Sequence, residues 1–184
     1  MRGIGRKSIR PVVAAFELVL VVQLVGASYT TGMAAAAWGR GVATYADGAA
    51  AFRAESGHVF TALLAFLLVF IAAALLAPFT LGISLLAFFF LFVYAMPAAV
   101  IGERGGFAAL GASYRLATRA FGTAAIVILV LAIIFIIAGF ISGALHTIPL
   151  LGPLVSEIIG QAALAYFTLV VVGEYLNARN RVEN

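Results

Sequence analysis

The chain has no cysteine, few charged residues and only two histidines. Without cysteine, disulfides, thiol catalysis, thiolate zinc sites and cysteine-ligated iron–sulfur clusters are excluded. No motif for nucleotide binding, metal binding or a nucleophilic residue is present either. We therefore predict no metal, no cofactor and no catalytic centre, so the protein is not expected to be an enzyme.

Charged residues make up 10% of the chain and hydrophobic ones 65%. A soluble domain carries about 25% charged residues and cannot hide so much apolar surface. A helix crosses the hydrocarbon core of a bilayer with about 20 apolar residues. Four apolar runs meet this length, and none alternates with period two as barrel strands would. They cover residues 58–77, 81–101, 123–145 and 154–176.

The N-terminal segment, residues 11–38, is apolar but interrupted by Glu17 and Gln23. It resembles a signal peptide, yet its apolar character resumes after Thr31, which favours a retained membrane segment. A single crossing is our prediction, and a shallow hairpin is the alternative. The expected fold is therefore all-α, a polytopic transmembrane bundle of about five membrane helices.

The formal net charge of +4 has a simple explanation in a membrane protein. Basic loop residues contact anionic lipid headgroups, so we expect membrane lipids as partners and no nucleic acid. The predicted localisation is the cell membrane, with a multi-pass topology.

A polar stretch that we call the elbow, residues 94–123, separates two apolar runs. Pro97 is expected to break the helix, and the sequence GERGG forms a charged turn after it. The following segment predicts a short amphipathic helix on the membrane surface. Helical spacing places Arg115 and Arg119 on one face, one turn apart. A second face is predicted to hold Phe107, Leu110, Tyr114 and Ala117.

The elbow also has a counterpart earlier in the chain. Residues 45–62 align without a gap on residues 107–124, each with an aromatic residue followed later by an aromatic residue and arginine. We therefore predict two elbow-plus-hairpin units, residues 40–101 and 102–178, after the N-terminal segment. Two membrane helices would separate the elbows, so both would lie on one side of the bilayer.

Basic residues indicate which side that is. Five crossings would place Arg40, Arg53, Arg104, Arg115, Arg119, Arg179 and Arg181 on one side. They would place Arg2, Arg6, Lys7 and Arg10 on the other. The larger group predicts that the elbows face the cytoplasm. A hairpin over residues 11–38 would instead bring both groups to the cytoplasmic side.

The elbow resembles a pattern in poorly characterised bacterial membrane families. Its matching residues are Met96-Pro97, Gly102-Glu103, Ala108-Ala109-Leu110 and Ser113-Tyr114-Arg115-Leu116. In those families a proline and a glutamate precede an elbow of the form EAL-x-x-S-x-x-L and a new membrane helix. One such family forms the membrane domain of some glycerophosphodiester phosphodiesterases. The resemblance implies a bacterial inner membrane and no catalytic residues, since the phosphodiesterase chemistry belongs to a separate soluble domain.

Two groups of polar residues are candidate sites. The first would anchor the elbow or bind lipid, through an ion pair between a glutamate and an elbow arginine or through arginine contacts to phosphate. It comprises Arg53, Glu103, Arg115, Arg119 and Glu174. The second would be an intramembrane polar site, since ionisable groups in apolar helices are costly. It comprises Glu17, Glu157 and Gln161, with His146 in the turn before the last two.

Three functions remain open at this stage. The first is a non-catalytic membrane module that binds lipid or a partner. The second is a small oligomeric transporter or channel. The third is an accessory subunit of a larger membrane complex.

Overall fold

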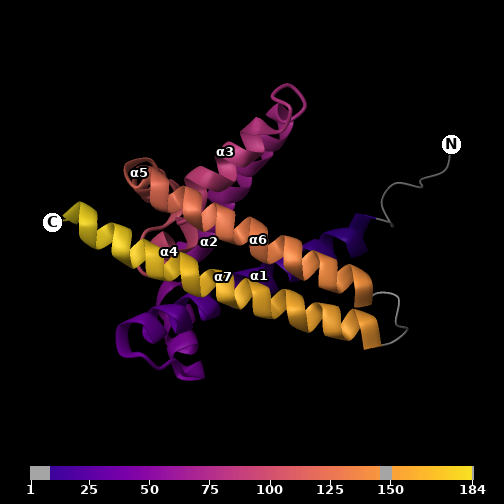
Figure 1. The fold of residues 1–184 in the computed structure, drawn as a ribbon, viewed down its shortest axis with the longest axis horizontal. Coiled ribbons are helices and arrows are strands. Elements are labelled where there is room, and N and C mark those ends of the chain that lie inside the picture. Colours follow the sequence, from indigo (N-terminus) through magenta and orange to yellow (C-terminus); the bar gives the residue numbers. More distant parts are fainter. Residues whose placement is uncertain (1–8, 146–150, 184) are drawn as a thin grey trace.

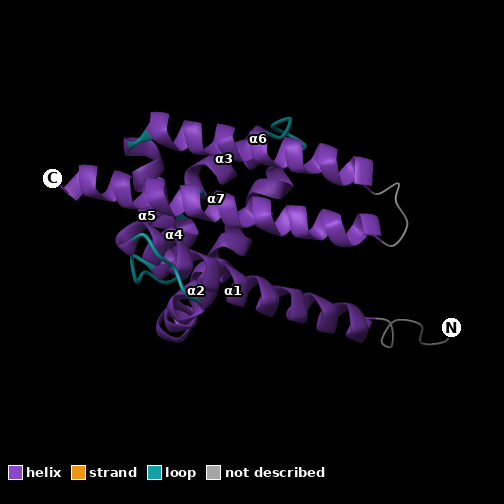
Figure 2. Cartoon of the chain, turned by 60° about the horizontal axis from the view of Figure 1, so that its bottom comes forward, coloured by secondary structure: helices purple, strands orange, loops and turns teal. Residues whose placement is uncertain are grey.

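The computed structural model describes the backbone of residues 9–145 and 151–183, and all regular structure in these ranges is α-helical. The helices are α1 (Ile9–Arg40), α2 (Tyr45–Leu76), α3 (Ile83–Phe92), α4 (Ala95–Val100), α5 (Gly106–Arg119), α6 (Phe121–Leu145) and α7 (Leu151–Glu183). Helices α6 and α7 lie side by side along the length of the molecule (Figures 1 and 2). Helix α1 begins at the end where α6 meets α7 and finishes at the end where the C-terminus and α5 lie.

Four long apolar helices confirm the predicted membrane runs. The candidate spans in the described residues are Tyr45–Leu76, Ile83–Val100, Phe121–Leu145 and Gly152–Arg181. Large apolar side chains on these helices point outward: Phe140 is 77% exposed and Leu68 and Leu129 are each 60% exposed. Such a surface suits lipid and not water. The chain is an integral membrane protein with an all-α, multi-pass bundle.

Helix α1 is one uninterrupted helix of 32 residues. At 1.5 Å per residue it is about 48 Å long, more than a bilayer core requires. The alternative hairpin over residues 11–38 is therefore not formed.

Helix α1 approaches α2 closely because both carry glycine at the crossing. A Cβ on Gly32 would lie 2.3 Å from the Cβ of Ala51, and one on Gly48 would lie 2.4 Å from the ring of Tyr29. The hydroxyl of Tyr29 donates a 2.6 Å hydrogen bond to the carbonyl of Tyr45 at the start of α2. Small residues that let helices approach are typical of packing in membranes, where no hydrophobic force draws the helices together.

The connection from α1 to α2 is held by polar contacts. Thr44 and Asp47 form a capping box at the start of α2, and the backbone N–H of Thr44 donates a 2.8 Å hydrogen bond to Asp47 Oδ2. Arg40, the last residue of α1, pairs with the same carboxylate. These contacts satisfy backbone donors that a helix N-terminus leaves free.

Helix α1 is joined to α7 through Trp38. Its Nε1 donates a 2.7 Å hydrogen bond to the carbonyl of Leu169. The ring lies over Gly173, where a Cβ would come within 2.4 Å of Trp38 Cε2. Glycine is therefore required at this point of α7.

Helices α2 and α3 form a hairpin with a short turn that contains Pro78. The Oγ of Ser84 donates a 2.7 Å hydrogen bond to the carbonyl of Ala73 across the turn. Below it, Phe88 packs edge-on against Phe66 and Phe70, with ring centroids 4.6 and 5.5 Å apart. The turn and the aromatic cluster set the register of the two helices.

The two aligned elbow segments differ in structure. Residues 45–62 lie within α2, which continues from Tyr45 into its apolar part without a break. Residues 107–124 are divided between α5 and α6, because Ala120 leaves the helical region with φ −108° and ψ 47°. Gly122, a poor helix former, follows this break, whereas Phe60 occupies the aligned position in α2. The predicted separate helix for the first elbow is therefore not formed.

Gly173→Ala is expected to weaken the contact between α1 and α7. Overpacking against Trp38 costs about 1–3 kcal/mol, less the roughly 1 kcal/mol that alanine gains over glycine within a helix. Thermal unfolding in detergent micelles, followed by the fluorescence of the single tryptophan, measures the change. Gly160→Ala in the same helix is the matched control, since nothing lies within 4 Å of its added Cβ. Equal stability of the two variants would contradict the close approach.

Candidate functional site

The elbow begins where the membrane span Ile83–Val100 is broken. Helix α3 ends at Phe92, and α4 begins after Tyr94, whose φ of −94° and ψ of 7° are not helical. Pro97 lies in the first turn of α4, where its missing N–H would have had no partner in any case. The break that Pro97 predicts is thus formed, three residues before the proline. Most of α4 is buried, so the break lies within the protein core.

Ser113 of α5 closes the hydrogen bonds of this break. Its Oγ accepts a 3.1 Å hydrogen bond from the N–H of Tyr94 and donates a 2.8 Å bond to the carbonyl of Leu91. Ser113 is fully buried. A buried, unpaired backbone group costs about 1–3 kcal/mol, so this serine holds α5 against the break between α3 and α4.

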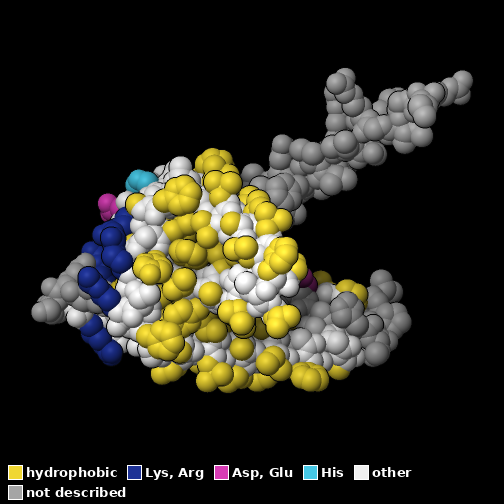
Figure 3. All heavy atoms as spheres, turned by 90° about the horizontal axis from the view of Figure 1, so that it is seen from above, with side chains coloured by type: hydrophobic (Ala, Val, Ile, Leu, Met, Phe, Trp, Pro, Cys, Tyr) yellow, Lys and Arg dark blue, Asp and Glu magenta, His cyan; other side chains and the backbone are white. Residues whose placement is uncertain are grey.

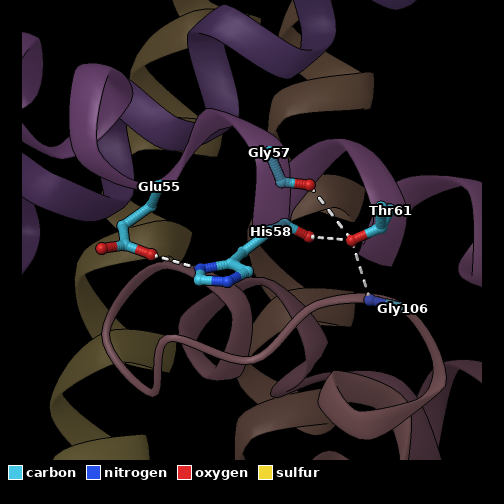
Figure 4. A network of polar contacts seen from close by, with 5 residues as sticks. All are labelled: Glu55, Gly57, His58, Thr61 and Gly106. Carbon is cyan, nitrogen blue, oxygen red and sulfur yellow. Dashed lines mark hydrogen bonds and ion pairs between the residues drawn. The ribbon is translucent and has the colours of Figure 1, made fainter.

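Thr61 of α2 holds the beginning of α5 (Figure 4). Its Oγ1 accepts a 3.0 Å hydrogen bond from the N–H of Gly106 and donates to the carbonyl of His58 at 3.0 Å. A Cβ on Gly105 would lie 2.6 Å from the same oxygen, so glycine allows this approach. Glu55 pairs with His58 at 2.7 Å beside this contact. The turn before α5 is therefore held against α2.

The predicted shared face of α5 is divided between the protein interior and the outer surface. The buried face is made of small residues and one leucine: Ala109, Leu110, Ala112, Ser113 and Ala117. Phe107 and Tyr114 were predicted to share the face of Leu110, but they are 64% and 50% exposed. Small side chains occupy the buried face because α5 packs closely on α2, α3 and α4. The aromatic side chains are left on the outer surface.

The predicted ion pair between a glutamate and an elbow arginine is not formed among the described residues. The ion pairs there join Arg40 to Asp47 and Glu55 to His58. Glu174 does come near Arg119, since both line a cavity of about 300 Å³ together with Arg181. Glu103 is exposed in the turn before α5, with a left-handed φ of 51°. The elbow is therefore anchored by Ser113 and Thr61, which the sequence reasoning did not select.

Arginines from three segments meet in a cavity of about 140 Å³, which we call the arginine pocket. Arg104 comes from the turn before α5, Arg115 and Arg119 come from α5, and Arg179 comes from α7. The remaining wall is formed by Gly102, Ala112, Leu116 and Tyr175. The prediction included Arg115 and Arg119 in one site, and helical spacing was enough for that. The sequence placed Arg104 and Arg179 on one side of the membrane but did not predict that they line one cavity.

A larger apolar cavity of about 470 Å³ lies further along the bundle. Aromatic side chains such as Phe89, Phe135 and Phe167 form much of its wall. Its polar groups include Gln161, Thr30 and Thr168. Its volume lies in the range of about 300–1,000 Å³ that is usual for small-molecule sites.

The predicted intramembrane polar residues are only partly assembled. The Nε2 of Gln161 donates a 2.8 Å hydrogen bond to Oε1 of Glu157, so these two side chains do share a face of α7. The backbone of Glu17 lies in α1, and its side chain is outside the described residues, as is the whole of His146. The part of the chain that the structure describes holds no cluster of three or more potential metal ligands.

Arg53 is exposed on α2 and does not line the arginine pocket. It belongs to the same basic end of the molecule without being part of the cavity. A variant at Arg53 therefore removes a positive charge from this end of the molecule without changing the arginine pocket.

Comparison with known proteins returns no match: no protein-family model, no curated protein and no solved structure is similar to this chain. The resemblance of the elbow to bacterial membrane families therefore stays a prediction.

Ser113→Ala is expected to destabilise the protein by about 1–3 kcal/mol, because it leaves the buried N–H of Tyr94 and the carbonyl of Leu91 without their partner. Thermal or denaturant unfolding in micelles measures the loss. Thr118→Ala is the control on the same helix, since Thr118 bonds only within α5 to the carbonyls of Tyr114 and Arg115. If Ser113→Ala is no less stable than the control, Ser113 does not hold the break.

Proposed function

We propose that the protein is a non-catalytic membrane module that binds anionic lipid at its elbow end. The observation that carries this proposal is the concentration of arginine at one end of an apolar molecule. In Figure 3 the arginine side chains that the structure describes gather at one end, beside a broad hydrophobic surface. The exposed arginines of the described residues are Arg40, Arg53, Arg104, Arg115, Arg119 and Arg181.

The position of the aromatic residues supports the same function. Phe107 and Tyr114 are exposed on α5, next to the arginines of the same helix. Aromatic side chains favour the boundary between headgroups and hydrocarbon, and arginine binds phosphate there through its planar fork. Helix α5 thus has an outer surface suited to the cytoplasmic leaflet of a bacterial inner membrane.

The proposal includes five membrane helices, with α1 as the fifth. Helix α1 is long enough to cross and runs between the two ends of the molecule. It also includes two related units, residues 40–101 and 102–178, because each has a basic segment followed by two membrane helices. This topology places the elbow end in the cytoplasm and the N-terminus on the opposite side.

Single cysteines test this topology cleanly, because the native chain contains none. Phe79→Cys, in the turn between α2 and α3, and Ser8→Cys are expected to react with an impermeant maleimide from outside intact cells. Ala108→Cys on α5 is expected to react only after the membrane is opened. Labelling of Ser8→Cys and Ala108→Cys from the same side would contradict five crossings.

Trp38 tests lipid binding, since it is the single tryptophan and is 56% exposed near the elbow end. In vesicles that mix anionic and zwitterionic lipid equally, bromine on the anionic chains is expected to quench Trp38 more than bromine on the zwitterionic chains. Added salt is expected to reduce the difference, because it screens exposed charges. Equal quenching by the two lipids would refute a preference for anionic lipid.

A small transporter is the second candidate, and the apolar cavity of about 470 Å³ is the observation that favours it. Gln161 brings an amide group to this apolar wall, and polar side chains in membrane helices often mark substrate pathways. Uptake by proteoliposomes that falls on Gln161→Leu would support transport over a lipid-binding role.

A further inference from the structure

We propose that the arginine pocket is a built site for a single phosphate group. The inference deepens the proposed function and rests on it, because it names the chemical group that the elbow recognises. The shared chemistry is a phosphate monoester or inorganic phosphate. Its source is either a lipid headgroup or a free ion, and the experiment below separates the two.

The charge of the pocket is the first argument. Four arginines surround a cavity of about 140 Å³. In the part of the chain that the structure describes, Arg104, Arg115 and Arg119 have no carboxylate within ion-pair distance. Like charges one helical turn apart, such as Arg115 and Arg119, repel each other. A bound anion would turn this repulsion into attraction.

Among the side chains that the structure describes, the nearby carboxylates do not fill this role. Asp47 pairs with Arg40, and Glu55 pairs with His58. Glu174 lines the neighbouring cavity of about 300 Å³ and not the arginine pocket. Glu103, next to Arg104 in the chain, is exposed and does not line the pocket either. Arg104 and Arg115 are therefore left for an external anion, and Arg119 lies between the arginine pocket and the neighbouring cavity.

The shape of the pocket is the second argument. A water molecule occupies about 30 Å³ of liquid, so the cavity has room for a tetrahedral anion. One wall is formed by Gly102, where a Cβ would lie 2.8 Å from Tyr175 Oη and 2.6 Å from the carbonyl of Ala98. The wall formed by Ala112 and Tyr175 is buried, whereas Arg104, Arg115 and Arg119 are exposed. The inner wall of the pocket is therefore buried, and its opening is lined by charged side chains.

The origin of the four arginines is the third argument. They come from the turn before α5, from α5 itself and from α7, and the tertiary fold brings them together. Ser113 and Thr61 hold α5 and the turn before it against the bundle. Backbone positions held in this way keep these arginines next to one cavity, and arginine forks bind phosphate with two parallel hydrogen bonds.

The test uses the full chain in uncharged maltoside micelles and titration calorimetry with three probes. They are inorganic phosphate, dioctanoyl phosphatidate and dioctanoylglycerol, which has the same chains without the phosphate. Phosphatidate is expected to bind and dioctanoylglycerol is not. Phosphatidate binding much more tightly than inorganic phosphate identifies a lipid headgroup as the source, and equal affinities identify the free ion. Absence of binding by both phosphate-containing probes overturns the site.

Variants distinguish the pocket from general charge. The double variant Arg115→Gln with Arg119→Gln is expected to weaken phosphatidate binding about tenfold or more. Arg115→Lys keeps the charge but loses the planar fork, and a several-fold loss is expected. The single variant Arg115→Gln removes one charge inside the pocket, and Arg53→Gln removes one charge outside it. Arg53→Gln is expected to weaken the affinity less than Arg115→Gln does. If the two variants weaken binding equally, charge alone explains the binding and the pocket proposal is wrong.

The quenching of Trp38 separates this proposal from the proposed function. If anionic lipid quenches Trp38 preferentially but no phosphate probe binds, the result supports the lipid-binding role and contradicts the phosphate site. In the opposite case, Trp38 quenching is equal for the two lipids while inorganic phosphate binds and Arg115→Lys lowers its affinity. That result supports the phosphate site and contradicts the lipid-binding role. Unchanged thermal unfolding of each variant shows that loss of binding is not loss of fold.

Discussion

The break between α3 and α4 is the constraint on which the elbow depends. A helix that is interrupted inside an apolar bundle leaves backbone groups that no water can satisfy, and each would cost several kcal/mol in hydrocarbon. One side chain, Ser113, bonds to both the N–H of Tyr94 and the carbonyl of Leu91. Since Ser113 belongs to α5, the same contact that closes the break also fixes the elbow helix. Arg115 and Arg119 follow on that helix, so the position of the basic residues depends on a hydrogen bond in the core.

Small residues allow the other close contacts between helices. Helix α1 meets α2 through Gly32 and Gly48, and Trp38 lies over Gly173 of α7. The inner face of α5 is largely alanine and serine. This pattern follows from the solvent: lipid is as apolar as leucine, so large side chains gain little by turning inward and close backbone approach gives the attraction. Large apolar side chains therefore cover the outside of the bundle, as Phe140 and Leu68 do.

Much of the fold was predictable, and the site was less so. The apolar runs at residues 58–77, 81–101, 123–145 and 154–176 coincide with the four candidate membrane spans, because length and hydropathy are local properties. The break that divides the second span into α3 and α4 is a detail of the structure. The face predicted for α5 is divided in the structure, with Leu110 and Ala117 buried and Phe107 and Tyr114 exposed, since periodicity does not show where a neighbouring helix ends its cover. The predicted separate first elbow helix is part of α2, because an alignment of residue types does not reveal where a helix breaks.

The amino-acid sequence by itself determined the class of this protein: an apolar, all-helical membrane protein without cysteine, with arginine next to its membrane helices. Those properties depend on composition and on residues close together in the chain. The tertiary structure decided which distant residues share a site. It brought Arg104 and Arg179 to the pair Arg115 and Arg119, and it left Glu174 in the neighbouring cavity. The reason is that charge becomes a binding site only when folding concentrates it around one space, and no local pattern encodes that space.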